Sequence, residues 1–115
     1  MTDEQEAPLS LQRAQLMVDA SIIALGGYWA PLANLARLFE ECGELARAVN
    51  QAYGPKVIKK DEAPAAVAAE LGDTLYVVLV LANSLHLDAD AALRGALDRA
   101  EARATVGQSG AVGAE

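Results

Sequence analysis

The sequence predicts an all-α protein, a four-helix-type bundle, and three observations support this fold class. Apolar residues recur every three or four positions in the longer segments, which is the spacing of one face of an α-helix. The breaks between these segments carry helix-ending residues, namely Gly26-Gly27, Gly54-Pro55 and His86-Leu87-Asp88. The valine-rich stretch 75–81 would also suit a buried strand, but no partner strand is visible for it.

The first two predicted helices are bounded by proline and glycine. The first is opened by Ser10 or by the preceding Pro8, and it ends at the glycine pair 26–27. A short aromatic connector then leads to Pro31, which suits the first turn of a helix because its missing N–H costs no hydrogen bond there. The second helix therefore runs from Pro31 to about Tyr53.

The last two predicted helices differ in character. The third begins near Pro64 and continues to about Leu85. Its second half is apolar on all sides, so we expect it to be buried on more than one side. The fourth helix covers about 89–104, with Asp88 or Asp90 as its N-cap.

The length of 115 residues indicates one domain. We expect a helical domain over 9–104, a disordered acidic tip over 1–8 and a disordered tail, rich in Gly and Ala, over 105–115. Apolar residues make up 53% of the chain, but many are alanines, and a small domain buries only a modest share of its surface. We therefore expect dimerisation or tetramerisation to complete the core.

The charge of the chain argues against nucleic acid and membranes as partners. The formal net charge is −7 and the pI is about 4.6, which leaves no basic footprint for a polyanion. The longest uncharged run, 74–87, is too short and too polar for a membrane span. A single cysteine, Cys42, excludes an intrachain disulfide, and the acidic N-terminus lacks the features of a signal peptide. We expect a cytoplasmic protein.

Two pairs of carboxylates are the most informative residues. Glu41 and Glu44 are three positions apart on the second predicted helix, and Glu70 and Asp73 are three apart on the third, so each pair projects from one face. Both pairs interrupt strongly apolar segments, where like charges repel unless a cation neutralises them. Oxygen ligands from two helices suit Mg²⁺, or Mn²⁺ as a possible substitute. The alternative interpretation is ordinary solvated acids on amphipathic helices.

These motifs lead to a family. Glu-Glu-x-x-Glu, beginning at Glu40, followed by Glu-x-x-Asp on the next helix, is the signature of the MazG-like nucleotide pyrophosphohydrolases, which the stretch 28–103 resembles. The segments that carry the resemblance are Pro31-Leu32-Ala33, Arg37-Leu38-Phe39-Glu40-Glu41-Cys42-Gly43-Glu44-Leu45, Glu70-Leu71-Gly72-Asp73 and Leu81-Ala82-Asn83-Ser84-Leu85.

The resemblance implies a chemistry and a set of ligands. It implies cleavage between the α- and β-phosphates of a nucleoside triphosphate, which yields the monophosphate and pyrophosphate. It implies that Glu41, Glu44, Glu70 and Asp73 hold Mg²⁺, while Glu40 helps to bind metal or positions the attacking water. It also implies a bundle whose core forms across a homodimer, often with two dimers making a homotetramer.

Basic residues are the first group of candidate substrate contacts. Lys56, Lys59 and Lys60 form the only basic cluster, which is either a solvated loop or a phosphate-binding one. Family members often carry a Lys and an Asn on the last helix. Arg99 is the candidate replacement for that lysine, and no asparagine is present there.

Aromatic and amide side chains are the second group. Trp29 would stack on a base or anchor the core, and Asn34 would read a base edge or face solvent. Tyr76, one helical turn from Asp73, would line the pocket or pack in the core. Asn83 needs a hydrogen-bond partner inside an apolar helix, which would be a base or, slightly favoured, a neighbouring helix.

Two other functions remain open from the sequence alone. One is a non-catalytic helical interaction or regulatory module, which the missing asparagine on the last helix keeps possible. The other is a related enzyme acting on phosphoribosyl-ATP, which would share the chemistry. A di-iron bundle would need Glu-x-x-His motifs, and the only histidine, His86, lies far from both acidic motifs.

Overall fold

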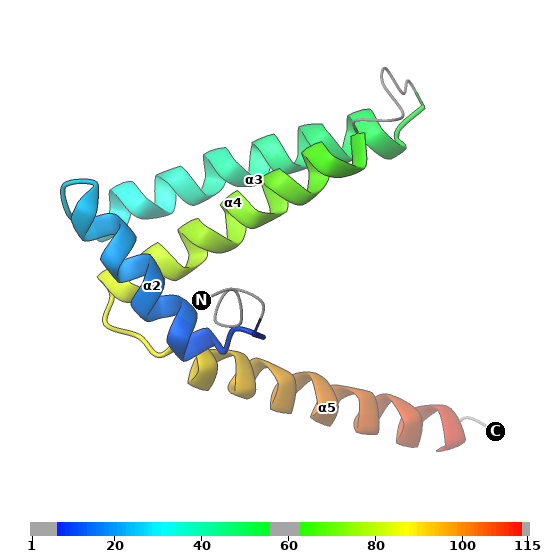
Figure 1. The fold of residues 1–115 in the computed structure, drawn as a ribbon. Helices are drawn as coiled ribbons and strands as arrows, with labels where there is room; N and C mark the ends of the chain where they lie inside the picture. Colours follow the sequence, from blue (N-terminus) through cyan, green and yellow to red (C-terminus); the bar gives the residue numbers. More distant parts are fainter. Residues whose placement is uncertain (1–6, 56–62, 114–115) are drawn as a thin grey trace.

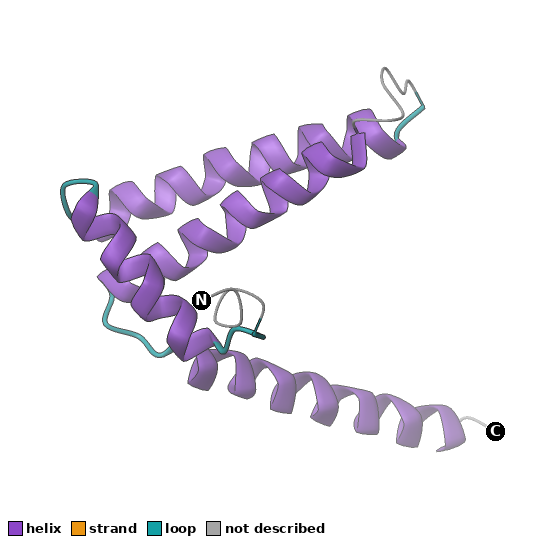
Figure 2. Ribbon diagram, in the orientation of Figure 1, coloured by secondary structure: helices purple, strands orange, loops and turns teal. Residues whose placement is uncertain are grey.

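The computed structural model describes residues 7–55 and 63–113, and all regular secondary structure in these ranges is helical (Figures 1 and 2). The predicted all-α class is therefore confirmed. The helices are α2 (Leu11–Ala24), α3 (Pro31–Tyr53), α4 (Ala63–Ser84) and α5 (Ala89–Gly113).

The arrangement is built around an antiparallel pair of long helices. Helices α3 and α4 lie side by side along most of their length, and α2 crosses the pair at one end (Figure 1). Helix α5 contacts α2 near its own beginning and then extends away from the α3–α4 pair (Figure 1). The site-bearing helices α3 and α4 are thus held by direct packing, whereas α5 projects from them.

The helix ends agree with the capping residues in the sequence. The Ser10 hydroxyl accepts a hydrogen bond from a backbone N–H of the first turn of α2 at 3.0 Å, so Ser10 is the N-cap. Gly26 and Gly27 have φ of 115° and 103°, values that glycine adopts without steric cost, and they end α2. Asp88, rather than Asp90, caps α5, because its Oδ1 accepts from the Asp90 N–H at 2.9 Å.

The predicted disordered tail is wrong over 105–113. Helix α5 continues to Gly113 instead of ending near 104. The prediction rested on the content of small residues, but alanine is the best helix former and no proline interrupts this segment. The Thr105 hydroxyl also donates to the Glu101 carbonyl one turn earlier, at 3.1 Å, which is compatible with a continuing helix.

The core of a single chain is small. It consists mainly of Val18 and Ile22 of α2 packed against Val80 of α4, with Tyr28 and Tyr76 at its edge. The second half of α4 was predicted to be buried on more than one side. Within one chain, α4 packs against both α2 and α3, and Val77 and Val80 are buried, whereas Leu75 is 56% exposed. Burial of the remaining apolar surface in an oligomer stays a prediction.

Helix α4 is also apolar enough to qualify as a membrane span by length and composition, over Ala65–Ser84. The uncharged run 74–87 considered in the sequence is shorter than this window, because it begins only after Glu70 and Asp73. Only 17% of the window is buried within the chain. The packing of α4 against α3 and α2 covers part of this apolar surface. The carboxylates of Glu70 and Asp73 interrupt the apolar sequence of the helix.

Candidate metal centre and nucleotide site

Three of the predicted ligands meet between α3 and α4. One carboxylate oxygen from each of Glu41, Glu70 and Asp73 lies within 4.8 Å of the other two. The Glu41 and Glu70 side chains are half-buried and Asp73 is exposed, so the group opens to solvent on one side. Glu44 lies outside this group of three and is exposed.

A threonine next to the carboxylates links the two helices. The Thr74 hydroxyl lies 2.8 Å from the Glu70 carbonyl oxygen and 3.5 Å from the Glu41 carbonyl oxygen. It donates mainly to Glu70, one turn back along α4, and points towards the backbone of α3 at the same level. Thr74 therefore lies where it helps to set the register that brings the two acidic motifs together. Sequence reasoning missed it, although Thr directly follows the Glu-x-x-Asp motif.

The electrostatics of the group favour a bound cation. Partial burial raises the pKa of the Glu70 carboxyl above its ordinary value, and the charges of Asp73, Glu44 and Glu41 raise that pKa further. The effect of Glu44 on Glu70 indicates that its charge acts on the group even though it lies outside the set of three. Oxygen donors alone, converging from two helices, fit Mg²⁺ or Mn²⁺ and disfavour softer metals.

Glu40 lies beside this group rather than in it. It directly precedes Glu41, is exposed, and by helical geometry points about 100° away from it around α3. Its separate role in handling water therefore stays a prediction.

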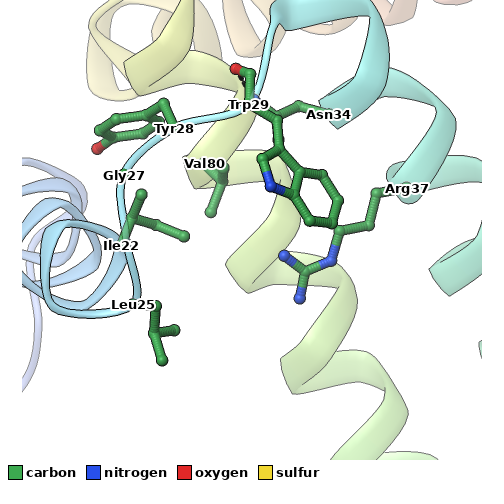
Figure 3. Close-up of a pocket in the computed structure, with 8 residues that line it drawn as sticks. All are labelled: Ile22, Leu25, Gly27, Tyr28, Trp29, Asn34, Arg37 and Val80. Atoms are coloured by element: carbon green, nitrogen blue, oxygen red, sulfur yellow. Dashed lines mark hydrogen bonds between the residues drawn. The ribbon is translucent and has the colours of Figure 1, made fainter.

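A cavity of about 380 Å³ opens beside the connector between α2 and α3 (Figure 3). Trp29, which is 60% exposed, and Asn34, which is only 2% exposed, both line it. The Asn34 amide donates to the Trp29 carbonyl oxygen at 3.0 Å, so the expectation that Asn34 faces solvent is wrong. Arg37 also lines the cavity, and sequence reasoning did not single it out. Its position four residues before Glu41 was the available signal.

Two other predicted contacts are used in packing within the chain. The Tyr76 hydroxyl pairs with the Ser21 hydroxyl of α2 at 2.8 Å. The Asn83 amide donates to the Gln15 carbonyl oxygen at 3.0 Å and to the Tyr28 hydroxyl at 3.1 Å. The neighbouring-helix alternative for Asn83 is therefore confirmed, and neither side chain is among those that line the Trp29 cavity.

The basic candidates are not brought to the carboxylates in the described part of the chain. Arg99 is exposed on α5, the helix that extends away from α3 and α4 (Figure 1). Lys56, Lys59 and Lys60 lie outside the described residues. A phosphate contact by any of these four residues stays a prediction.

The antiparallel pair α3 and α4, with Glu41, Glu70 and Asp73 brought together between them, defines an all-α protein with a candidate site for a hard metal. Residues 30–106 match the family model of the MazG nucleotide pyrophosphohydrolase domain, and the chain belongs to this family. The resemblance drawn from the two acidic motifs is therefore confirmed, and with it the enzyme class that the family represents.

Solved structures agree with this assignment. The crystal structure of the Bacillus-conserved MazG protein, a nucleotide pyrophosphohydrolase, matches with a TM-score of 0.69 and 40% identity over 82% of this chain and 90% of that one. The crystal structure of YPJD from Bacillus subtilis matches with a TM-score of 0.70 and 37% identity over 81% of this chain and 96% of that one.

Among curated proteins, the uncharacterized protein YpjD of Bacillus subtilis (strain 168) is 50% identical over 66 residues, or 57% of this chain. The matched region spans 60% of the length of that relative.

Proposed function

We propose that this protein is a magnesium-dependent nucleoside triphosphate pyrophosphohydrolase that releases a nucleoside monophosphate and pyrophosphate from ribo- or deoxyribonucleotides. The observation that carries the proposal is the convergence of the Glu41, Glu70 and Asp73 carboxylate oxygens within 4.8 Å, in a chain of this family. A polyanionic substrate facing an acidic group needs a cation between the two. Such an enzyme would serve housekeeping of the nucleotide pool in the cytoplasm.

The residues divide the work as follows. Glu41, Glu70 and Asp73 hold Mg²⁺, and Glu44 adds its charge from the next turn of α3. Magnesium, when bound, neutralises phosphate oxygens and supplies Lewis acidity. Glu40 accepts a proton from a water whose oxygen attacks the α-phosphorus. The bond from that phosphorus to the bridging oxygen breaks in line with the attack, and pyrophosphate leaves.

A direct test is a screen of the common and damaged nucleoside triphosphates with Mg²⁺, in which pyrophosphate release is measured. We expect release from at least one nucleotide, loss of release with a chelator, and recovery when Mg²⁺ or Mn²⁺ is added back. Phosphoribosyl-ATP belongs in the panel as the substrate of the alternative enzyme. A protein that releases no pyrophosphate from any of them, with metal bound, would instead be the non-catalytic helical module.

Mg²⁺ is expected to raise the melting temperature, because a ligand that binds only the folded state stabilises it. The Glu70→Gln variant sharpens this test. Its neutral side chain avoids the desolvation and the charge repulsion that raise the pKa of Glu70, so the metal-free variant should melt higher than the metal-free wild type. In millimolar Mg²⁺ the order should reverse, since the variant has lost a ligand. Thermal melts with and without Mg²⁺ check both statements, and an identical Mg²⁺ response in the two proteins would rule out Glu70 as a ligand.

A homodimer or homotetramer is expected at micromolar concentration. Large apolar side chains stay exposed on the helices of one chain, among them Leu32 at 80% and Phe39 at 68% on α3. Leu97 on α5 is likewise 59% exposed. Such surface is covered most simply by further copies of the same chain. Multi-angle light scattering should report twice or four times the chain mass of 12.0 kDa, and a purely monomeric protein would refute the oligomer.

A further inference from the structure

The Trp29 cavity and the carboxylate group lie along the same face of α3. Asn34, Arg37, Glu41 and Glu44 follow one another at spacings of three, four and three residues, which is one stripe of a helix. Arg37 and Glu41 are therefore separated by about 6 Å along the helix axis. If the phosphates of a nucleotide lie at the carboxylate group, its nucleoside reaches the cavity when the nucleotide extends along α3 from Glu41 towards Arg37.

On α4, as on α3, a residue that lines the cavity and a residue of the carboxylate group lie near each other along the helix. Val80 lines the cavity, and Asp73 belongs to the carboxylate group, with the fully buried Val77 between them. Helices α3 and α4 run antiparallel and are in contact (Figure 1). The cavity-lining residues of these two helices therefore precede Glu41 on α3 and follow Asp73 on α4, which places the cavity and the acidic group next to each other along the helix pair.

The Arg37 guanidinium lies over the Trp29 ring. Its guanidinium carbon lies 5.7 Å from the centre of the Trp29 ring, a cation–π arrangement (Figure 3). A guanidinium presents its five N–H donors in its own plane, so an aromatic ring against its face leaves those donors free. Among the described residues, no carboxylate forms an ion pair with Arg37.

The lining of the cavity fits a planar apolar ring better than a phosphate. Ile22, Leu25 and Val80 contribute aliphatic surface, and Trp29 contributes an exposed aromatic face. Among the described residues that line the cavity, Arg37 alone is charged. A volume of about 380 Å³ lies in the range of small-molecule sites, which are mostly apolar with few polar groups.

We propose that Trp29 and Arg37 form the nucleobase subsite of the enzyme, and that Arg37 selects bases presenting two adjacent hydrogen-bond acceptors. Guanine offers O6 and N7, and cytosine offers O2 and N3, to a bidentate guanidinium. Adenine places an amino donor beside N7, and uracil and thymine flank an N–H with their carbonyls, so these bases meet Arg37 with one acceptor at most. This inference rests on the proposed nucleotide function and adds the base preference to it.

Trp29 is the only tryptophan in the chain, so intrinsic fluorescence reports on this subsite directly. We expect guanosine and cytidine monophosphates, titrated in the presence of Mg²⁺, to change the Trp29 emission and to bind about tenfold more tightly than adenosine and uridine monophosphates. The analogue 7-deazaguanosine monophosphate lacks the N7 acceptor and should bind to the wild-type protein about tenfold more weakly than guanosine monophosphate if the guanine edge is read at N7.

Arg37→Lys and Arg37→Gln should keep Mg²⁺ binding and lose most of the preference, because neither side chain has a guanidinium fork. Arg13→Gln is the matched control, since Arg13 is exposed at the far end of α2 from the cavity. A wild-type protein with no preference for guanine and cytosine, or an Arg37→Lys variant that retains it in full, would overturn the proposal. If the Arg37 variants do not fold, an equal affinity of the wild type for guanosine and 7-deazaguanosine monophosphates, together with no cytidine preference, overturns it without them.

Pyrophosphate release from the matching triphosphates, measured on the same preparations, separates this inference from the proposed function. Pyrophosphate release that depends on Glu41 but is equally fast for all four bases would contradict the proposed base preference and still support the proposed enzymatic function. Base-selective binding of monophosphates without any pyrophosphate release would contradict the proposed enzymatic function and still support the proposed base-binding subsite.

Discussion

Glu41→Gln and Asp73→Asn are each expected to lose Mg²⁺ affinity and pyrophosphohydrolase activity together. Each change keeps the side-chain volume and removes one charged oxygen donor from the group that meets within 4.8 Å. The activity should fall by more than about 100-fold, because changes to residues that merely support metal ligands already cost about 10–100-fold. The defect should appear as weaker metal and nucleotide binding as well as a slower reaction.

Calorimetric titration of Mg²⁺ and of a non-hydrolysable nucleotide measures both losses. Asp98→Asn is the matched control, because it makes the same chemical change at an exposed position of α5, away from α3 and α4. The control should retain wild-type affinity. Full activity in Glu41→Gln and Asp73→Asn would contradict both the metal centre and the proposed reaction.

The part of this site that the sequence predicted is the part set by local geometry. Two carboxylates three residues apart share a helix face whatever surrounds them, so the Glu41 and Glu70 motifs were visible in the sequence. The beginning of α3 at Pro31 and its end at Tyr53 were predicted for the same reason, since proline and glycine act on the backbone directly.

The features that the sequence did not reveal depend on how helices meet. Arg37 and Trp29 are eight residues apart, and their contact requires the specific turn of the connector after Gly27. Thr74 gains its role only when α3 and α4 pack at one register. Asn34 was placed in solvent as one of two options because amides are mostly exposed, yet here its amide holds the connector.

The 105–113 segment was mispredicted for a different reason. Its composition of small residues is shared by flexible tails and by alanine-rich helices, and composition alone does not separate them. The helix lengthens α5 beyond the match to the family model, which ends at residue 106.

Glu40→Gln is expected to slow the chemical step while leaving Mg²⁺ and nucleotide binding nearly intact. Glu40 is exposed next to Glu41 but points to a different side of α3 and lies outside the three-carboxylate group. If its carboxylate accepts a proton from the attacking water, the amide cannot replace it, and kcat should fall by about 10²–10⁴-fold. A loss confined to kcat marks a residue that acts in the transition state rather than in binding.

The comparison with Asp73→Asn decides between the two roles that the family resemblance leaves for Glu40. Steady-state kinetics at saturating Mg²⁺, with calorimetry on the same variants, should show an unchanged Kd for Mg²⁺ in Glu40→Gln and a weakened one in Asp73→Asn. Binding losses of equal size in both variants would make Glu40 a primary ligand, and the division between metal-holding and proton-accepting carboxylates would then be wrong. A near wild-type kcat in Glu40→Gln, with Mg²⁺ bound, would show instead that the water needs no carboxylate base from this position of α3.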